Sequence, residues 1–391
     1  MNAARQSREH FSSMGSNPIE ASANRVSSKI SNMGLVCACM VVLIHVPRAG
    51  GDFAWWMNRI LQMGICKIAV PFFFIVSGYF LSKHFYECGW WEREVVKRMR
   101  SIVVPFIVWT SAFTLMTIAA YVAMNVHKGL PFFERITPSF VINSLGFNPL
   151  HLPGNEPLWY VRALFGCVLI SPLLKKFATK LGLAILFSAY CIVCPDWSSG
   201  NNVIRYGLLQ GPISLFAIFF FTLGIYLRGK SFNALTCGWC LILAFLGATF
   251  VMLRCVFERR GEWFVPFYIL CWLPVVWQLV PSKSFGPVAK YSFPIFLMHF
   301  FFTSSVINHP MRWLSASCGY LGTIAGWLLT LLVCLLCGDL IMRMSRISAI
   351  VFGGRVKCQR HHCSRRETNM ANGILHTVHY VESNQGRREY A

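Results

Sequence analysis

Long apolar runs separated by short polar turns fill most of the chain, from about residue 28 to residue 342. A transmembrane helix needs about 20 mainly apolar residues, and ten runs reach or approach that length. They lie at about 28–47, 57–82, 101–125, 157–175, 180–195, 211–228, 234–255, 263–281, 288–307 and 318–342. This pattern predicts an all-α protein, a polytopic bundle of about ten transmembrane helices. Because the run at 180–195 is short, nine or eleven spans also fit the pattern.

Composition favours a membrane protein over a soluble one. Hydrophobic residues make up 55% of the 391 residues and charged residues only 13%, whereas about 25% of the residues in soluble domains are charged. The 16 cysteines lie mostly inside apolar runs, where a cysteine packs as a small hydrophobic residue. A disulfide framework is therefore not expected.

The formal net charge of +21 comes mainly from basic residues at the ends of apolar runs and in the two tails. Such a distribution is typical of topology signals in cytoplasmic loops, so we do not expect nucleic acid as a partner. With the N-terminus inside the cell, every second loop and the C-terminal tail are basic, which predicts that both termini are cytoplasmic. The loop with Arg254, Arg259 and Arg260 conflicts with this assignment, because it falls on the outer side.

Polarity divides the chain into three predicted parts. Residues 1–28 form a polar cytoplasmic tail, residues 29–342 the membrane domain, and residues 343–391 a basic, disordered cytoplasmic tail. The last part contains CQRHHC, from Cys358 to Cys363. Structural zinc sites usually draw their ligands from two separated elements. A basic tail near anionic lipid is therefore favoured over a zinc site, and no metal is expected.

Ionisable side chains inside membrane spans are costly and call for an explanation. Of those in the predicted spans, we single out His45, Lys67, Arg162, Lys290, His299 and Asp339. The rise of a helix puts His45 roughly 24 Å above the inner end of the first span, in the outer half of the bilayer. His45 can be a polar residue near the headgroups or part of a functional site. Asp339 is expected to pair with Arg343, one helical turn later.

Lys67 and Arg162 each allow two interpretations. Lys67 can extend to the headgroups, or it can neutralise an anionic group in a cavity. Arg162 can anchor the helix at the interface, or it can bind a carboxylate or phosphate with two parallel hydrogen bonds.

The second predicted span carries Pro71 and Gly78. Proline frees a backbone carbonyl and glycine permits close helix approach, so we expect a kinked and tightly packed helix. The inner loop that follows holds Lys97, Arg98 and Arg100. These residues can serve topology alone, or they can bind a cytosolic polyphosphate such as the pyrophosphate of coenzyme A.

Four stretches together resemble acyltransferase family 3: LVCACMVVLIH, AVPFFFIVSGYFL, VVKRMRSIVVPFIVW and AKYSFPIFLMHFFF. PLWYVRALFGCVLISPLL is similar to a further element of that family, and the likeness extends over about 30–340. Members are multi-pass membrane enzymes that move acyl groups, typically acetyl from acetyl-CoA, onto extracytoplasmic sugars. The resemblance implies acetyl-CoA as co-substrate, a carbohydrate or glycolipid acceptor, and a location in the lipid bilayer of the bacterial inner membrane.

The resemblance also implies roles for particular residues. His45 would act as general base, and Lys67 or Arg162 would stabilise the oxyanion. A covalent acyl-enzyme on His45 or Ser77 is an alternative to direct transfer. The remaining assignments form two groups: Lys97, Arg98, Arg100 and Ser77 would bind the acyl-CoA, and His299, Tyr79 and Trp159 would line the substrate cavity. His299 can instead make a structural hydrogen bond.

One position departs from the family pattern. In the family a basic residue precedes the first-span histidine with ten residues between them, and here that position is Gly34. Lys29 falls about 160° away around the helix and cannot replace it on the same face. The positive charge must then come from another helix, with Lys67 as first candidate and Arg162 as second.

A transporter is the alternative function. Ten spans with a few charges inside the membrane also fit a secondary transporter or flippase for a polar or lipid-linked solute. Transporter folds often contain internal repeats, and the sequence has no clear repeat, which counts modestly against this alternative.

Overall fold

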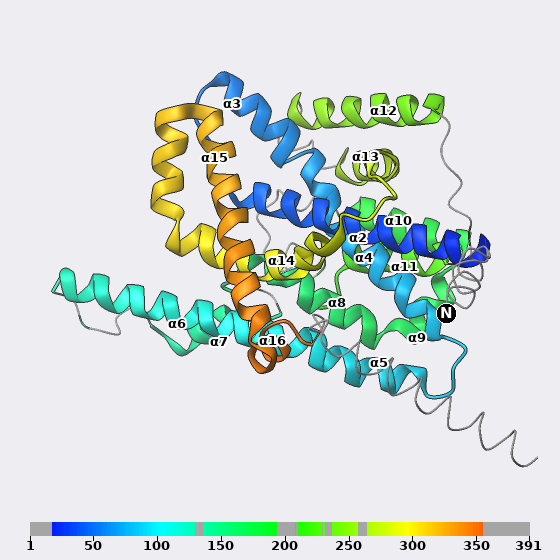
Figure 1. Cartoon of the computed structure of the whole chain (residues 1–391), viewed down its shortest axis with the longest axis horizontal. Coiled ribbons are helices and arrows are strands. Elements are labelled where there is room, and N and C mark those ends of the chain that lie inside the picture. The colour runs from blue at the N-terminus through cyan, green and yellow to red at the C-terminus, as the bar shows by residue number, and fades with distance from the viewer. Residues whose placement is uncertain are drawn as a thin grey trace, which may run out of the picture.

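Every regular element that the structure describes is a helix (Figure 1). The computed structural model describes residues 18–354 except 130, 132–135, 150, 194–207, 209, 229, 231–236 and 257–263. Its α-helices are α2 (Pro18–His45), α3 (Asp52–Met57), α4 (Ala69–Leu81), α5 (Trp90–Arg98), α6 (Val104–His127), α7 (Pro138–Ser144), α8 (Trp159–Leu169), α9 (Ser171–Phe177), α10 (Lys180–Val193), α11 (Leu215–Leu227), α12 (Cys237–Val256), α13 (Val265–Leu279), α14 (Ser292–Phe301), α15 (Asn308–Arg343) and α16 (Ser345–Val351).

Several of the helical stretches suit a membrane. Within the described residues, five are long and apolar enough to cross one: Val26–His45, Asp52–His84, Trp90–His127, Gly238–Val256 and Asn308–Arg343. A sixth arises if Glu156–Leu169 and Ser171–Phe177, which meet at 77°, are one broken span. Helices α10, α11 and α13 are apolar but shorter. An all-helical, multi-pass protein is thus confirmed, whereas ten spans and two cytoplasmic termini stay predictions.

The ends of the described chain extend the helices into both predicted tails. Helix α2 begins at Pro18, so the last part of the tail predicted at 1–28 is helical. Helix α16, Ser345–Val351, lies within the tail predicted at 343–391. The CQRHHC segment lies outside the described residues.

Helix α2 ends at His45 for a local reason. Pro47 follows two residues later, and a proline disfavours the helical conformation of the residue before it. That residue, Val46, is buried. Because α2 packs against α4 and α14, its last turn is held inside the bundle.

The second predicted span is broken at Gly64, before the predicted kink at Pro71. Helix α3 continues into a π-helical turn, Asn58–Gln62, and then a 3-10 turn, Ile65–Ile68, leads into α4. A side chain at Gly64 would meet the carbonyl oxygen of Ile60. Pro71 instead lies in the first turn of α4, where its missing N–H costs no helical hydrogen bond.

Tight packing of this helix is confirmed by two glycines that face across one interface. A Cβ added at Gly78 of α4 would meet the carbonyl oxygen of Phe221 in α11. A Cβ added at Gly224 of α11 would meet the carbonyl oxygen of Ile75 in α4. The two backbones approach this closely only because both positions lack side chains.

The run at 288–307 forms three pieces rather than one continuous helix. A 3-10 turn, Gly286–Tyr291, precedes α14, and a π-helical turn, Phe302–Val306, follows it. Residues 294–299 of α14 are all buried. Helix α14 therefore belongs to the interior, where it packs against α2 and α15.

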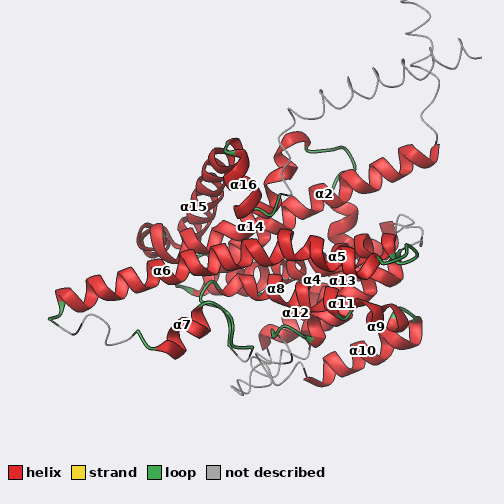
Figure 2. Ribbon diagram, turned by 90° about the horizontal axis from the view of Figure 1, so that it is seen from below, coloured by secondary structure: helices red, strands yellow, loops and turns green. Residues whose placement is uncertain are grey.

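Two long helices give the molecule its outline. Helix α15 reverses direction at Gly319, whose φ of 57° and ψ of −137° are not helical, and Figure 1 shows the two limbs side by side. Helix α6 projects beyond the other helices in both views (Figures 1 and 2). Near the end of α15, Asp339 accepts a 2.7 Å ion pair from Arg343, as predicted, and a 2.8 Å hydrogen bond from Tyr291.

Candidate active site

A cavity of about 360 Å³ lies at the end of α2. Three of the predicted site residues line it: His45, Lys67 and Trp159. Four further polar residues line it that the sequence analysis did not assign to a site: Arg48, Glu156, Gln210 and Arg254. These seven side chains come from five separate segments of the chain, so the cavity exists only once the bundle has assembled.

His45 is the last residue of α2 and is half-buried. Its ring centroid lies 5.3 Å from that of His299 and 5.2 Å from that of Phe300. The phenyl ring meets the imidazole edge to face, at 83°. Residues of α14 therefore fix the orientation of His45, while the cavity leaves another side of the ring accessible.

His299 is fully buried and lies behind His45 rather than among the residues that line the cavity. Its Nδ1 donates to the carbonyl oxygens of Phe296, at 2.8 Å, and Ile295, at 3.2 Å. In the neutral form of the ring, a proton on Nδ1 leaves Nε2 with a lone pair. Among the described residues, Nε2 has no hydrogen-bond partner. The structural alternative for His299 thus has geometric support.

Three basic side chains share the cavity with His45. Lys67 comes from the 3-10 turn before α4, and Arg48 follows the end of α2. Arg254 is buried near the end of α12 and donates a 2.9 Å hydrogen bond to the carbonyl oxygen of Met63, beside the break in the second span. Met63, which accepts this hydrogen bond, and Lys67 lie on either side of the break, and both line the cavity.

Gly34, where the family pattern has a basic residue, lies against α14. The carbonyl oxygen of Gly34 accepts a 2.9 Å hydrogen bond from the hydroxyl of Ser292, so α14 packs directly on this part of α2. Lys29 points elsewhere, with its ammonium 5.2 Å from the centroid of the Trp277 ring. The basic residues that line the cavity together with His45 are Lys67, Arg48 and Arg254.

Arg254 is the residue that sequence reasoning missed most clearly. Its loop was the one that conflicted with the positive-inside pattern. A cation on the side of the membrane where topology does not call for one needs another explanation. That conflict was the available signal, and the cavity now accounts for Arg254.

Arg162 does not line the His45 cavity. Its guanidinium donates to four backbone carbonyl oxygens, at distances of 3.0–3.4 Å: those of Gly146, Asn148, His151 and Gln210. Since Gln210 itself lines the cavity, Arg162 holds a wall of the cavity in place. It is a positioning residue in this geometry.

Ser77 and Tyr79 lie farther along α4 and are not among the residues that line the His45 cavity. Tyr79 lines a separate apolar groove. The carbonyl oxygen of Tyr79 accepts a hydrogen bond from Ser82. The structure therefore does not bring these two residues together with His45.

The predicted basic cluster lines a second cavity, of about 850 Å³, beside α5 and the chain after α16. Lys97, Arg98 and Arg100 all contribute, together with Arg93. Gly353, in the left-handed conformation at φ 64°, brings its backbone against Ser101 on the same wall. Four cations against the one carboxylate of Glu92 give this open concave surface an excess of positive charge, which suits an anionic ligand with several phosphates.

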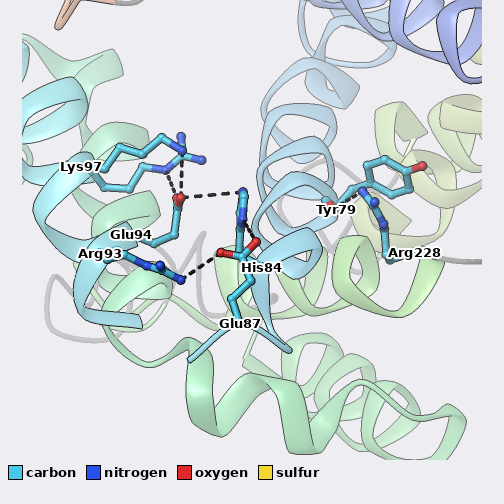
Figure 3. A network of polar contacts seen from close by, with 8 residues as sticks. Tyr79, His84, Glu87, Arg93, Glu94, Lys97 and Arg228 are labelled. Atoms are coloured by element: carbon cyan, nitrogen blue, oxygen red, sulfur yellow. Dashed lines mark hydrogen bonds and ion pairs between the residues drawn. The ribbon is translucent and has the colours of Figure 1, made fainter. Parts of the chain in front are cut away.

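Buried Glu94 organises two members of this cluster (Figure 3). Its carboxylate accepts from Lys97 at 2.8 Å and from Arg98 at 3.3 Å. The neighbouring carboxylate of Glu87 accepts from His84 at 2.7 Å and from Arg93 at 2.9 Å. The hydrogen bond from His84 lowers the pKa of Glu87 below its usual value.

Metal ligands do not gather in the described part of the chain, where no group of three or more His, Cys, Asp or Glu side chains has suitable geometry.

Comparison with known proteins identifies the family of this chain. The model of an acyltransferase domain matches residues 33–343. The chain belongs to acyltransferase family 3. The match contains every residue named above in the His45 cavity and the cluster at Lys97, Arg98 and Arg100. The predicted resemblance is thereby confirmed, and the prediction of an acyltransferase is confirmed at the level of the family.

One curated relative of this acyltransferase family 3 chain is the succinoglycan biosynthesis protein ExoH of Rhizobium meliloti (strain 1021), 25% identical over 214 residues. The aligned part covers 51% of this chain and 54% of the relative, so the chain spans about half the length of the curated protein it matches. No solved structure matches the chain.

Proposed function

We propose that the protein is an integral membrane O-acyltransferase that moves an acetyl group from cytosolic acetyl-CoA to a hydroxyl of an extracytoplasmic or envelope carbohydrate. The observation that carries this proposal is the cavity in which His45 lies beside Lys67 and Arg254, within a chain of an acyltransferase family. A glycan acceptor is supported by the relative named for succinoglycan biosynthesis. The bacterial inner membrane is the proposed location.

His45 would act as the general base. Its imidazole would accept the proton of the acceptor hydroxyl while that oxygen attacks the thioester carbonyl carbon. A new C–O bond forms, the C–S bond breaks, and the departing sulfur takes the proton back from His45. The products are the acetyl ester and free coenzyme A, so the step needs no further reactant.

The oxyanion would be stabilised by a cation already in the cavity. Lys67 and Arg254 both line the space that His45 faces. Charges held in a site shielded from water stabilise a developing negative charge more strongly than they do in bulk solvent. Direct transfer is proposed over a relay through Ser77, because Ser77 is not among the lining residues.

The acyl-CoA would hold its phosphates in the second cavity. Lys97, Arg98 and Arg100 supply charge there, and the volume of about 850 Å³ is ample for a nucleotide group. The positive-inside pattern assigns this surface to the cytoplasm, where acyl-CoA would be the available donor.

The test compares membranes that contain wild type, His45→Ala or His309→Ala, each supplied with radiolabelled acetyl-CoA and envelope glycan. We expect His45→Ala to lose transfer by about 100- to 10,000-fold. His309→Ala is the matched control, because His309 is exposed at the start of α15. Equal transfer by wild type and His45→Ala contradicts the proposal. Solute uptake by the reconstituted protein without acetyl-CoA would favour a transporter.

A further inference from the structure

An apolar groove of about 290 Å³ lies between α2, α4, α11 and α13, apart from both cavities described above. Its walls are aliphatic and aromatic: Phe72, Ile75, Leu223, Leu227, Leu270 and Leu273 contribute. None of the residues named in the proposed reaction lines it. A groove with this lining suits a hydrocarbon chain.

Each of two aromatic residues in the groove has a basic side chain over its ring. The ammonium of Lys29 lies 5.2 Å from the centroid of Trp277, and the guanidinium carbon of Arg228 lies 4.9 Å from the centroid of Tyr79. Figure 3 shows Arg228 alongside Tyr79, whose carbonyl oxygen accepts a 3.4 Å hydrogen bond from Arg228. Such contacts hold the cations in place without neutralising their charge.

The two cations lie at the rim of the groove. Lys29 precedes the lining residue Ile30, and Arg228 follows the lining residue Leu227. Within the described part of the chain, neither takes part in an ion pair. Two positive charges therefore remain available to an anion at this end of the groove.

The rim also lies at the end of the bundle away from His45. Helix α2 runs from Lys29 towards His45, and α4 runs back from the turn that contains Lys67 towards Tyr79. The positive-inside pattern assigns this end to the cytoplasmic leaflet, in which anionic lipids attract clustered basic residues.

We propose that this groove binds one acyl chain of an anionic glycerophospholipid, with Lys29 and Arg228 on its phosphate. The apolar wall alone would accept a chain from any lipid. The pair of cations supplies the selection, since a zwitterionic headgroup gains less from two positive charges than an anionic one does.

The experiment uses the full chain in vesicles of unlabelled phosphatidylcholine with a trace of a lipid that carries a photoactivatable group in one acyl chain. The trace lipid is phosphatidylglycerol in one arm and phosphatidylcholine in the other. After illumination, mass spectrometry measures labelling of peptides from α4, α11 and α13. Each basic residue near a membrane favours an anionic lipid by roughly fivefold, so we expect phosphatidylglycerol to label these peptides up to about 25-fold more.

Three variants test the assignment. Lys29→Gln/Arg228→Gln should reduce labelling by phosphatidylglycerol to the level of phosphatidylcholine. Leu273→Trp, which fills the groove, should remove labelling by both lipids. Lys230→Gln is the control, since Lys230 lies over Tyr226, which is not a lining residue. Equal labelling by the two lipids in wild type overturns the proposal, and so does a preference that persists in the double variant.

Discussion

The centroids of the imidazole rings of His45 and His299 lie 5.3 Å apart, and the two ring planes are tilted by 47°. His299 donates through Nδ1 to two carbonyl oxygens of its own helix, and these hydrogen bonds fix the orientation of its ring. His45 is the ring of the pair that reaches the cavity. The two histidines thus have different environments. His299 packs against His45 in the interior, and His45 faces the space where a substrate would bind.

This arrangement predicts that His299 acts through packing. His299→Phe keeps a ring of similar size behind His45, so we expect acetyl transfer within about tenfold of wild type, while His299→Ala should destabilise the protein by about 3–5 kcal/mol, as removal of buried rings does. Transfer and melting temperature are the two measurements. If His299→Phe were as inactive as His45→Ala in a stably folded protein, Nε2 of His299 would have to take part in the reaction.

Lys67 is predicted to act on the chemical step. Lys67→Met should lower kcat by about 100- to 1000-fold, the range found when an oxyanion donor is removed, with a smaller change in KM for acetyl-CoA. Lys67→Arg should restore part of the rate because the charge is kept. Lys290→Met serves as the control, since exposed Lys290 lies over Tyr291, outside the cavity. An effect of Lys67→Met on KM alone would instead assign Lys67 to binding.

The basic cluster is predicted to act on binding of the donor. Lys97→Gln/Arg100→Gln should raise KM for acetyl-CoA by about 10- to 100-fold, since a hydrogen bond to a charged group contributes about 1.5–3 kcal/mol, and kcat at saturation should change little. The matched control is Lys176→Gln, which removes an exposed cation at the end of α9. Calorimetric titration with desulfo-coenzyme A checks the affinity directly, and unchanged affinity of the double variant would refute this role.

Arg162 is predicted to matter for stability before it matters for chemistry. Arg162→Lys cannot satisfy four carbonyl oxygens at once, because an ammonium has three donors and lacks the planar fork of a guanidinium. We expect a lower melting temperature and faster proteolysis near Gly146 and His151. If the variant kept the melting temperature of wild type but lost acetyl transfer, Arg162 would again be a candidate for a catalytic residue.

The glycine contact between α4 and α11 is predicted to tolerate no side chain. Gly78→Ala and Gly224→Ala each place a methyl group against a backbone carbonyl of the opposite helix, and overpacking of this kind costs about 1–3 kcal/mol. Thermal unfolding in detergent measures the loss. Gly238→Ala in α12 should have no such effect, since no atom lies within 4 Å of the added Cβ.

The sequence by itself determined what depends on local composition. The length of the apolar runs predicted a helical membrane protein, the motifs around His45 and His299 predicted the family, and the proline after His45 set the end of α2. Each of these follows from a short stretch of chain, because hydrophobicity, helix termination and motif identity need no information from distant residues.

The tertiary structure alone decided which charges surround His45. Of the two cations predicted beside His45, Lys67 lines the same cavity and Arg162 does not, while Arg254, which was not predicted, lines it as well. Each placement depends on how α8 and α12 pack against the broken second span. The break at Gly64 also escaped prediction, because proline is the stronger local signal. Side chains that meet from segments far apart in the chain are fixed by helix packing, which a periodic apolar pattern specifies only coarsely.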